Sequence, residues 1–389
     1  MFHHPVLWSV LGVVLAYVTM GCAAEPAVVF PGRHWEQKIP AQVGLDAAKL
    51  EAFARFIQQP MGRQGEKPDT FRGVVIKDGY LVYAWGEQDA GGGWFSASKP
   101  VLSTLLFFAI QQGKLKGVDD LVGDWRWALS DKDRTMTFRH LADMTSGYAC
   151  DEAPGAAWAY NDFGIMLYAL TLERVYGCSI KDAADAVFAP LQLEDGSLIG
   201  DHLKGRGVST TPRDFARVGW FWLNRGNWNG RQVLAREFFD TYMKPDVPPG
   251  LPRTQTAEAN DYLDIGSYGG GHNQTDFGPG KYGFNWWFNA PVSKDGPLTF
   301  PDAPADIVMA SGYGGNLMVI LPSQRMVVAA RGSWGGVGGA RRGGANRLNE
   351  TLKLLMEAVQ AGPGATTQPG AGTTQPAATS PPATRSASQ

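Results

Sequence analysis

The sequence predicts an α/β (α+β) fold: an antiparallel sheet flanked by terminal helices, with an inserted, mainly helical region. Three observations predict it. Residues 71–86 and the chain after residue 281 are rich in strand-forming residues, whereas residues 94–245 mostly have the apolar spacing of helices. Helical patterns also occur near both ends, at 46–58 and 347–360. Strands on both sides of a helical region imply that the two ends pair in one sheet.

The first elements are a helix and a hairpin. Residues 46–58 carry apolar side chains at helical spacing. Two β-rich runs follow in FRGVVIKDGYLVYAWG, on either side of Lys77-Asp78-Gly79. A short turn of this composition between two hydrophobic runs predicts a β-hairpin.

Three further helices are predicted in the middle of the chain. Residues 97–112 are apolar almost all round, as in a buried helix, and the run stops at a glycine. Residues 163–176 repeat this pattern. Residues 212–224 follow Thr211 and begin with a proline, which is typical of a helix start.

Strand character returns after a glycine-rich loop at 265–281. Three short strands are predicted in YGFNWWFNA (282–290), GGNLMVILP (314–322) and RMVVAARGSW (325–334). A cleft between this sheet and the helical region is where we expect a functional site.

The composition favours a small, roughly neutral ligand. The 389 residues are 44% hydrophobic and 19% charged, which is enough apolar material for one large domain or two fused ones. The formal net charge is −2, with 35 basic and 37 acidic residues interspersed. Such a balance gives no reason to expect nucleic acid or an anionic membrane surface as a partner. It does not indicate an oligomeric state.

The two ends of the chain differ from its centre. Residues 5–24 are uncharged and mostly apolar, which predicts a signal peptide and an exported protein that is periplasmic, secreted or envelope-anchored. An uncleaved anchor stays open, because about 20 apolar residues span a bilayer, and so does lipid modification at Cys22. A membrane is a partner only in those two cases. Residues 362–389 have no large apolar side chain to bury, which predicts a disordered tail.

These features divide the chain into three parts. The predicted parts are the signal peptide or anchor (1–26), one folded domain (27–361, with sheet part 27–90 and 265–361 and helical part 91–264), and the tail (362–389).

Cysteine usage points away from metal chemistry. The three cysteines show no CxxC spacing and no neighbouring histidine cluster, so we predict no zinc site, no other metal and no cofactor. Cys150 and Cys178 form one disulfide in an oxidising compartment, or they are two free buried thiols; the sequence leaves both open.

One short motif can support nucleophilic catalysis. Ser96-Ala97-Ser98-Lys99 is the one S-x-x-K in the chain. At the start of a helix, Ser96 and Lys99 lie on one face. A serine hydroxyl needs an adjacent base, and a lysine serves when burial lowers its pKa to roughly 7–8. The apolar neighbours predict such a neutral lysine.

Further motifs accompany it in order. They are GKLKGVDDLVGDW (113–125), MTFRHLADMTSGY (136–148), WAYNDFGIMLYALTLERVYG (158–177), GVSTTPRDFARVG (207–219) and ASGYGGNLMVILP (310–322). With the S-x-x-K motif, this series resembles the serine β-lactamase-related hydrolases over residues 45–360, nearly the whole predicted domain. That family includes class C β-lactamases, penicillin-binding proteins, esterases and nylon-oligomer hydrolases. The resemblance implies a β-lactamase/transpeptidase-like fold.

The resemblance also implies roles for single residues. Ser96 would be acylated and Lys99 would take its proton. Tyr160 matches the tyrosine of the family's Y-x-N motif and would shuttle protons. The oxyanion hole would be formed by the backbone N–H groups of Ser96 and Tyr313. The third position of Y-x-N is Asp162 instead of asparagine, and we expect this side chain to contact the substrate or, more simply, to cap the following helix.

The family's third motif departs further. Its usual Lys or His followed by Thr/Ser-Gly reads Ala310-Ser311-Gly312 here. Ser311 and Gly312 are expected at the substrate, but the cation that meets a β-lactam or peptide carboxylate is missing. Arg341 or Arg342 is a possible substitute.

The sequence therefore predicts a serine hydrolase that cleaves a small-molecule ester or amide through an acyl-serine intermediate. A β-lactamase or DD-peptidase is the alternative within the enzymes. The alternative from another class is a non-catalytic cell-envelope binding protein with the same fold.

Other candidates stand apart from the motifs. His272, in GGGHNQTDFG, is expected to border the cleft and contact the substrate. His140 is expected to satisfy a hydrogen bond in the core or a turn. Trp158, Trp286 and Trp287 line an apolar pocket or, as is commoner for such residues, pack in the core.

Overall fold

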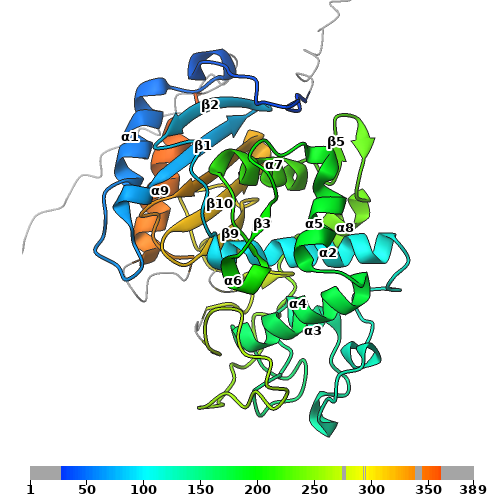
Figure 1. The fold of residues 1–389 in the computed structure, drawn as a ribbon. Helices are drawn as coiled ribbons and strands as arrows, with labels where there is room; N and C mark the ends of the chain where they lie inside the picture. Colours follow the sequence, from blue (N-terminus) through cyan, green and yellow to red (C-terminus); the bar gives the residue numbers. More distant parts are fainter. Residues whose placement is uncertain (1–27, 274–276, 292, 294, 338–343, 361–389) are drawn as a thin grey trace, which may run out of the picture.

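The computed structural model (Figure 1) describes residues 28–273, 277–291, 293, 295–337 and 344–360. The predicted signal peptide or anchor with Cys22, the predicted tail, and Arg341 and Arg342 lie outside the described residues. No helix among the described residues is both long and apolar enough to cross a bilayer.

A seven-stranded antiparallel sheet confirms the predicted fold class. Its strand order is β2-β1-β11-β10-β9-β8-β7, and two separate two-stranded sheets pair β3 with β4 and β5 with β6. The strands are β1 (Arg72–Lys77), β2 (Tyr80–Trp85), β3 (Ile199–Gly200), β4 (Gly207–Val208), β5 (Asn227–Trp228), β6 (Arg231–Gln232), β7 (Tyr282–Gly283), β8 (Trp286–Phe288), β9 (Val308–Gly312), β10 (Asn316–Leu321) and β11 (Met326–Arg331).

The two ends of the chain meet in this sheet, as the sequence predicts. β1 pairs with β11 from Arg72↔Arg331 to Lys77↔Met326. The β1–β2 hairpin turns at Asp78 and Gly79, which have φ angles of 55° and 89°. Gly79 is required there, because a Cβ atom would lie 2.0 Å from a backbone oxygen of the N-terminal segment.

Nine helices are present in the part of the chain that the structure describes. They are α1 (Ala47–Ile57), α2 (Lys99–Gln111), α3 (Phe138–Ala142), α4 (Asp162–Tyr176), α5 (Ile180–Phe188), α6 (His202–Gly205), α7 (Pro212–Leu223), α8 (Arg236–Tyr242) and α9 (Gly344–Glu357). The predicted helices 46–58, 163–176, 212–224 and 347–360 correspond to α1, α4, α7 and α9. The predicted helix 97–112 is α2 preceded by a 3-10 turn, η3 (Phe95–Ser98).

Helices from both ends pack beside the sheet. α1 and α9 lie side by side (Figure 1), and the Asp46 N–H donates to the Ala358 carbonyl oxygen at 2.8 Å. α7 packs against β1, β10 and β11. Its close approach depends on Gly219, where a Cβ atom would meet Met318 Sδ at 2.5 Å. The remaining helices form the inserted region at the other side of the molecule (Figure 1).

Within the seven-stranded sheet the strand prediction was incomplete in two places, and the short strands β3 to β6 were not predicted. The single strand predicted at 282–290 is two short strands, because Phe284 and Asn285 adopt φ angles of 45° and 71° and turn the chain. β9 was not predicted as a strand, since its sequence VMASG has small residues without the alternation that marks a half-buried strand.

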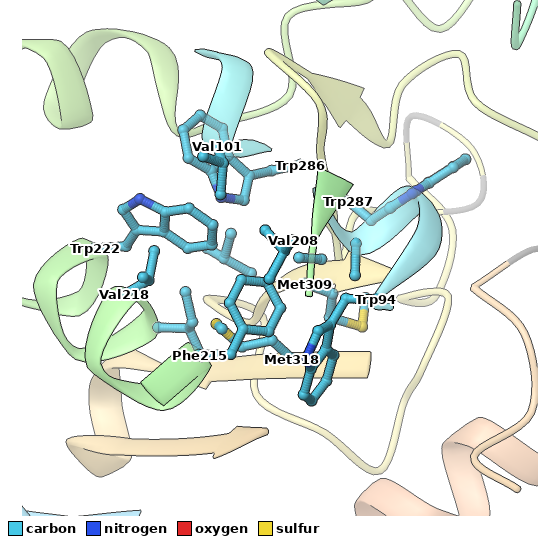
Figure 2. Packing of buried hydrophobic residues seen from close by; sticks show 14 of the residues in the cluster. Trp94, Val101, Val208, Phe215, Val218, Trp222, Trp286, Trp287, Met309 and Met318 are labelled. Carbon is cyan, nitrogen blue, oxygen red and sulfur yellow. The ribbon is translucent and has the colours of Figure 1, made fainter. Parts of the chain in front are cut away.

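The core contains most of the tryptophans. Trp158 and Trp286 are fully buried and Trp287 is 4% exposed, so they pack in the core instead of lining an open pocket. Figure 2 shows Phe215 of α7 beside Met318 of the sheet and near Trp94, whose ring centroid lies 4.7 Å from that of Phe215. This packing fixes the chain immediately before Ser96.

The two cysteines among the described residues are free thiols. Cys150 is buried and Cys178 is exposed, so the structure contains neither the disulfide nor a second buried thiol.

Candidate active site

Ser96 stands in a turn with an unusual backbone. It is the second residue of η3, directly before α2. The preceding residue, Phe95, has a φ angle of +50°, a left-handed conformation that non-glycine residues rarely adopt. Trp94 holds this turn in place: its backbone N–H donates to the Val208 oxygen at 2.9 Å and its indole N–H to the Thr210 oxygen at 3.0 Å.

Lys99 lies next to the Ser96 hydroxyl. Its Nζ is 2.8 Å from Ser96 Oγ, as the i, i+3 spacing predicts. Lys99 is fully buried at the start of α2. The structure therefore brings together the two residues of the S-x-x-K motif.

Tyr160 comes to the same point from a distant part of the sequence. Its hydroxyl oxygen lies 2.7 Å from Lys99 Nζ. The ring stacks on Trp287 of β8 with centroids 5.9 Å apart, and Tyr160 is 6% exposed. Packing in the core thus fixes the direction of the hydroxyl.

Asp162 is the fourth residue of this cluster and does not cap helix α4, which was the simpler expectation from the sequence. The cap of α4 is Asn161, whose side chain accepts from the N–H groups of Phe163 and Gly164. Asp162 is the first residue of the helix, and its Oδ1 forms an ion pair with Lys99 Nζ at 2.6 Å. The capping role expected for Asp162 was wrong, because its neighbour already satisfies the free N–H groups of the first turn.

The ion pair reverses the expected charge of Lys99. Burial lowers the pKa of Lys99, but the charge of Asp162 and the hydrogen bonds with Asp162 and Tyr160 raise it, and the net pKa lies above the ordinary lysine value. The prediction of a neutral lysine was therefore wrong, since it counted burial and not the carboxylate. Nζ has three oxygen neighbours, and an ammonium group has three protons to donate.

Strand β9 ends against the turn that presents Ser96, residues 94–98, which is the nucleophile turn of the site. A Cβ atom on Gly312 would lie 2.2 Å from the Trp94 carbonyl oxygen, so only glycine allows this approach. Tyr313 follows, 50% exposed, with its ring 5.7 Å from that of Phe95. Within the described part of the chain neither the Ser96 N–H nor the Tyr313 N–H donates a hydrogen bond. The oxyanion hole expected from these two groups stays a prediction.

The remaining predicted site residues lie around this cluster. Ser311 is half-buried on β9, opposite Leu317. His272 is half-buried, and its Nε2 lies 3.0 Å from the Thr256 oxygen. The residue before it, Gly271, accepts the Asp162 N–H at 2.9 Å. Substrate contacts of Ser311, Gly312 and His272 stay predictions. His140 makes the turn contact expected of it, accepting the Thr137 N–H.

One residue at the nucleophile turn was missed in the sequence. His202, in the short α6, accepts the Phe95 N–H on its Nε2 at 3.2 Å. Its sequence context, DHLKG, contains no motif, and the partners are 107 positions apart. No signal in the sequence connects them.

The comparison with known families agrees with this geometry. The family model described as Beta-lactamase matches residues 53–334. The chain belongs to the β-lactamase family. Members of this family are serine hydrolases, among them esterases, acyltransferases and DD-peptidases.

Individual relatives of this β-lactamase family member are distant. An uncharacterized protein of Alkalihalophilus pseudofirmus is 24% identical in an alignment of length 220 that covers 44% of this chain and 65% of that relative. The chain therefore spans less than two thirds of that relative's length. A β-lactamase/D-alanine carboxypeptidase structure from Yersinia pestis has 16% identity and a TM-score of 0.52, covering 81% of this chain and 100% of that one. Simvastatin synthase from Aspergillus terreus has 13% identity and a TM-score of 0.55, covering 82% and 100%. These similarities show the β-lactamase/transpeptidase-like fold.

Proposed function

We propose that this protein cleaves a small-molecule ester or amide through a covalent acyl-serine intermediate on Ser96. The observation that supports the proposal best is the buried cluster of Ser96, Lys99, Tyr160 and Asp162, in which three oxygens surround one ammonium group at 2.6–2.8 Å. A buried charged cluster of this kind is costly to the fold, and such clusters concentrate at functional sites.

The raised pKa of Lys99 determines the order of proton transfers. As an ammonium, Lys99 donates to Ser96 Oγ and cannot accept its proton. Lys99 first passes one proton to Asp162, and the neutral amine then takes the Ser96 hydroxyl proton while Oγ bonds to the substrate carbonyl carbon. Asp162 is thus the proton store of the site, a role that an asparagine at the same position does not offer.

Breakdown of the tetrahedral intermediate uses the same groups. The carbonyl oxygen receives the electron pair and is stabilised by the N–H groups of Ser96 and Tyr313. When the carbonyl re-forms, the leaving group departs with a proton that Lys99 supplies through the Tyr160 hydroxyl. Water then attacks the acyl-serine and gives its proton along this path to Lys99. Lys99 passes a proton to Ser96 Oγ, which leaves as a hydroxyl, and Asp162 returns its stored proton to Lys99.

The substrate class follows from the charges near Ser96. Ala310 is buried at the position where many family members carry a cation, so a substrate carboxylate finds no partner from that position of β9. This supports a neutral ester or amide over a β-lactam or peptide carboxylate.

A fluorophosphonate probe tests the proposal. The full-length protein is treated with the probe and its intact mass is measured, with Ser96→Ala and Ser98→Ala alongside. Ser98 is a matched control, because it lies in the same turn but its Oγ accepts the Val208 N–H at 2.8 Å. We expect one adduct on the wild type and on Ser98→Ala, and none on Ser96→Ala. An unlabelled, folded wild type would favour the non-catalytic envelope protein.

A substrate panel separates the enzyme classes. We expect turnover of p-nitrophenyl esters or short amides by the wild type and its loss in Ser96→Ala. Turnover restricted to a chromogenic β-lactam would instead identify a β-lactamase.

Export is a separate proposal, supported by the uncharged apolar run at 5–24. The N-terminal mass of protein recovered from cells tests it: loss of about the first 26 residues supports a cleaved signal, and an intact N-terminus in the cytoplasmic fraction contradicts export.

A further inference from the structure

The turn that presents Ser96 is fixed by a segment far away in the sequence. The Trp94 N–H donates to the Val208 oxygen at 2.9 Å, and in return the Val208 N–H donates to Ser98 Oγ at 2.8 Å. Between these two contacts Phe95 adopts its left-handed conformation, which a non-glycine side chain keeps only where its surroundings hold it. The question is therefore what holds Phe95.

His202 makes the contact to Phe95 itself. Its Nε2 accepts the Phe95 N–H at 3.2 Å, and the two rings meet edge to face with centroids 4.4 Å apart. The imidazole sits over Gly93, where a Cβ atom would come within 2.6 Å of the ring. The histidine is thus closely fitted to the turn from one side.

This contact requires one protonation state. A ring nitrogen that accepts an N–H carries no proton, so His202 is neutral with its proton on Nδ1. In the imidazolium both nitrogens donate, and the Nε2 proton would face the Phe95 N–H. The contacts of Trp94, Val208 and Ser98 involve no titratable group, so only the His202 contact depends on pH.

We propose that neutral His202 is a positioning residue for the nucleophile: by accepting the Phe95 N–H it keeps Phe95 left-handed and thereby directs the Oγ and the backbone N–H of Ser96. Protonation of His202 releases the turn and stops acylation. The inference rests on the proposed function, because it assumes that Ser96 is the nucleophile, and it names a regulation of that site by pH.

The electrostatic surroundings favour the neutral form. Burial, and then the positive charge of Arg331 on β11, lower the pKa of His202 below its ordinary value. The segment of His202 itself carries Asp201, Lys204 and Arg206, whereas the packed strands β3 and β4 carry no charged side chain and η3 contributes none before Lys99. At neutral pH the turn is therefore held, and it is released only on acidification below the ordinary histidine range near pH 6.5.

Two substitutions separate positioning from titration. In His202→Gln an amide oxygen can take the place of Nε2 and accept the Phe95 N–H at every pH, whereas His202→Ala removes the acceptor. We expect wild-type kcat/KM for a p-nitrophenyl ester to fall on acidification. His202→Gln should keep the neutral-pH activity. Its kcat/KM should fall less on acidification than that of the wild type, because the contribution of His202 protonation is absent. His202→Ala should lose roughly 10- to 100-fold at neutral pH, as small misplacements of reacting groups do. The difference from the wild type should shrink at acid pH, where the wild type loses the acceptor as well.

His140 supplies a matched control. It also accepts a backbone N–H, that of Thr137 on Nδ1 at 3.2 Å, and burial likewise lowers its pKa. Its contact closes the first turn of α3 and does not involve the nucleophile turn. His140→Gln should therefore keep the wild-type pH profile.

Three results would overturn the inference. The first is a fall of kcat/KM on acidification in His202→Gln that equals that of the wild type, and the second is wild-type kcat/KM at neutral pH in a folded His202→Ala. The third is an Nε2–H tautomer of His202 at neutral pH, measured by nitrogen NMR. The NMR measurement uses the wild type and does not depend on the folding of a variant. Fluorophosphonate labelling at neutral pH distinguishes the two failures. A wild type that labels on Ser96 but gives one of these results refutes only the role of His202, whereas an unlabelled wild type refutes the proposed function and this inference with it.

Discussion

Replacing Asp162 by asparagine removes one negative charge from the active-site cluster with almost no change in shape. In the wild type the Asp162 and Lys99 side chains are 6% and 1% exposed and their charged atoms are 2.6 Å apart. Without the carboxylate, burial becomes the dominant influence on Lys99 and its pKa falls below the ordinary lysine value. We therefore expect Asp162→Asn to contain a neutral Lys99 at neutral pH.

The size of the effect follows from the change in proton binding. Leaving one charge of a buried pair unpaired costs about 3–5 kcal/mol, and Lys99 limits this cost by releasing its proton. Each pKa unit by which folding depresses a lysine costs about 1.4 kcal/mol at a pH below both values. We expect Asp162→Asn to lower the free energy of unfolding by about 3 kcal/mol at pH 7.

The sign of the pH dependence distinguishes the two proteins. In the variant the unfolded chain binds a proton that folded Lys99 lacks, so stability rises with pH, by at most about 1.4 kcal/mol per unit below pH 10.4. In the wild type the folded pKa of Lys99 is raised. Its contribution to stability is fully present below pH 10.4 and is lost only as the pH rises through the higher pKa of the folded state. Lys99 therefore adds no pH dependence to the free energy of unfolding of the wild type between pH 7 and 9.

Urea unfolding at pH 7, 8 and 9 measures this difference. The double variant Lys99→Met/Asp162→Asn is the control, because it has neither charge and should show no added slope. If Asp162→Asn is destabilised equally at pH 7 and pH 9, Lys99 keeps its proton without the carboxylate. The proposed role of Asp162 as proton store would then fail.

Two further predictions concern the packing around the site. Gly312→Ala should lower the fluorophosphonate labelling rate roughly 100-fold, because its Cβ would lie 2.2 Å from the Trp94 oxygen and push β9 from the turn. Gly117→Ala is the control and should leave the labelling rate unchanged, because a Cβ atom there has nothing within 4 Å. Equal labelling rates of the two variants would contradict the argument. Asp143→Asn should raise the thermal midpoint by about 2 °C more at pH 8 than at pH 5. Burial, and then a neighbouring carboxylate, raise the pKa of Asp143 well above the carboxyl range, so the stability it contributes is present at low pH and lost as the pH rises through its folded pKa. The asparagine still accepts the Phe284 N–H, which meets Asp143 Oδ1 at 2.7 Å, and an equal change at both pH values would contradict this reasoning.

Local signals were enough to predict the main elements. The Asp78-Gly79 turn identified the hairpin, and the glycine after 163–176 marked the end of α4, where Gly177 has a φ angle of 73°. These features follow from the backbone preferences of residues close together in sequence. β9 escaped prediction because it is defined by its neighbours β8 and β10 and by the fit of Gly312 under the nucleophile turn, which a sequence of small residues does not reveal.

Within the site, the nearest pairing was predictable and the distant ones were not. Ser96 and Lys99 are three positions apart, so their contact follows from helical spacing. The resemblance to the family located Tyr160, 61 positions from Lys99. It treated Asp162 as the asparagine of the family motif and so did not predict its ion pair with Lys99. The contact between His202 and Phe95 has neither local spacing nor a motif. Long-range contacts of single polar groups depend on the folded geometry and leave no pattern in the sequence.

The two departures from the family motifs have one electrostatic consequence. Asp162 adds a negative charge beside Lys99 at 2.6 Å, and Ala310 removes a positive charge from β9. Both changes make the surroundings of Ser96 less positive, so Lys99 and Asp162 together leave the inner site without net charge. A carboxylate on the substrate then gains no attraction that would offset its loss of hydration. A neutral ester or amide loses little hydration on entering and develops negative charge only on the carbonyl oxygen, between the N–H groups of Ser96 and Tyr313. The asparagine-to-aspartate change therefore supports the same substrate class as the missing cation, although the two residues lie on different elements.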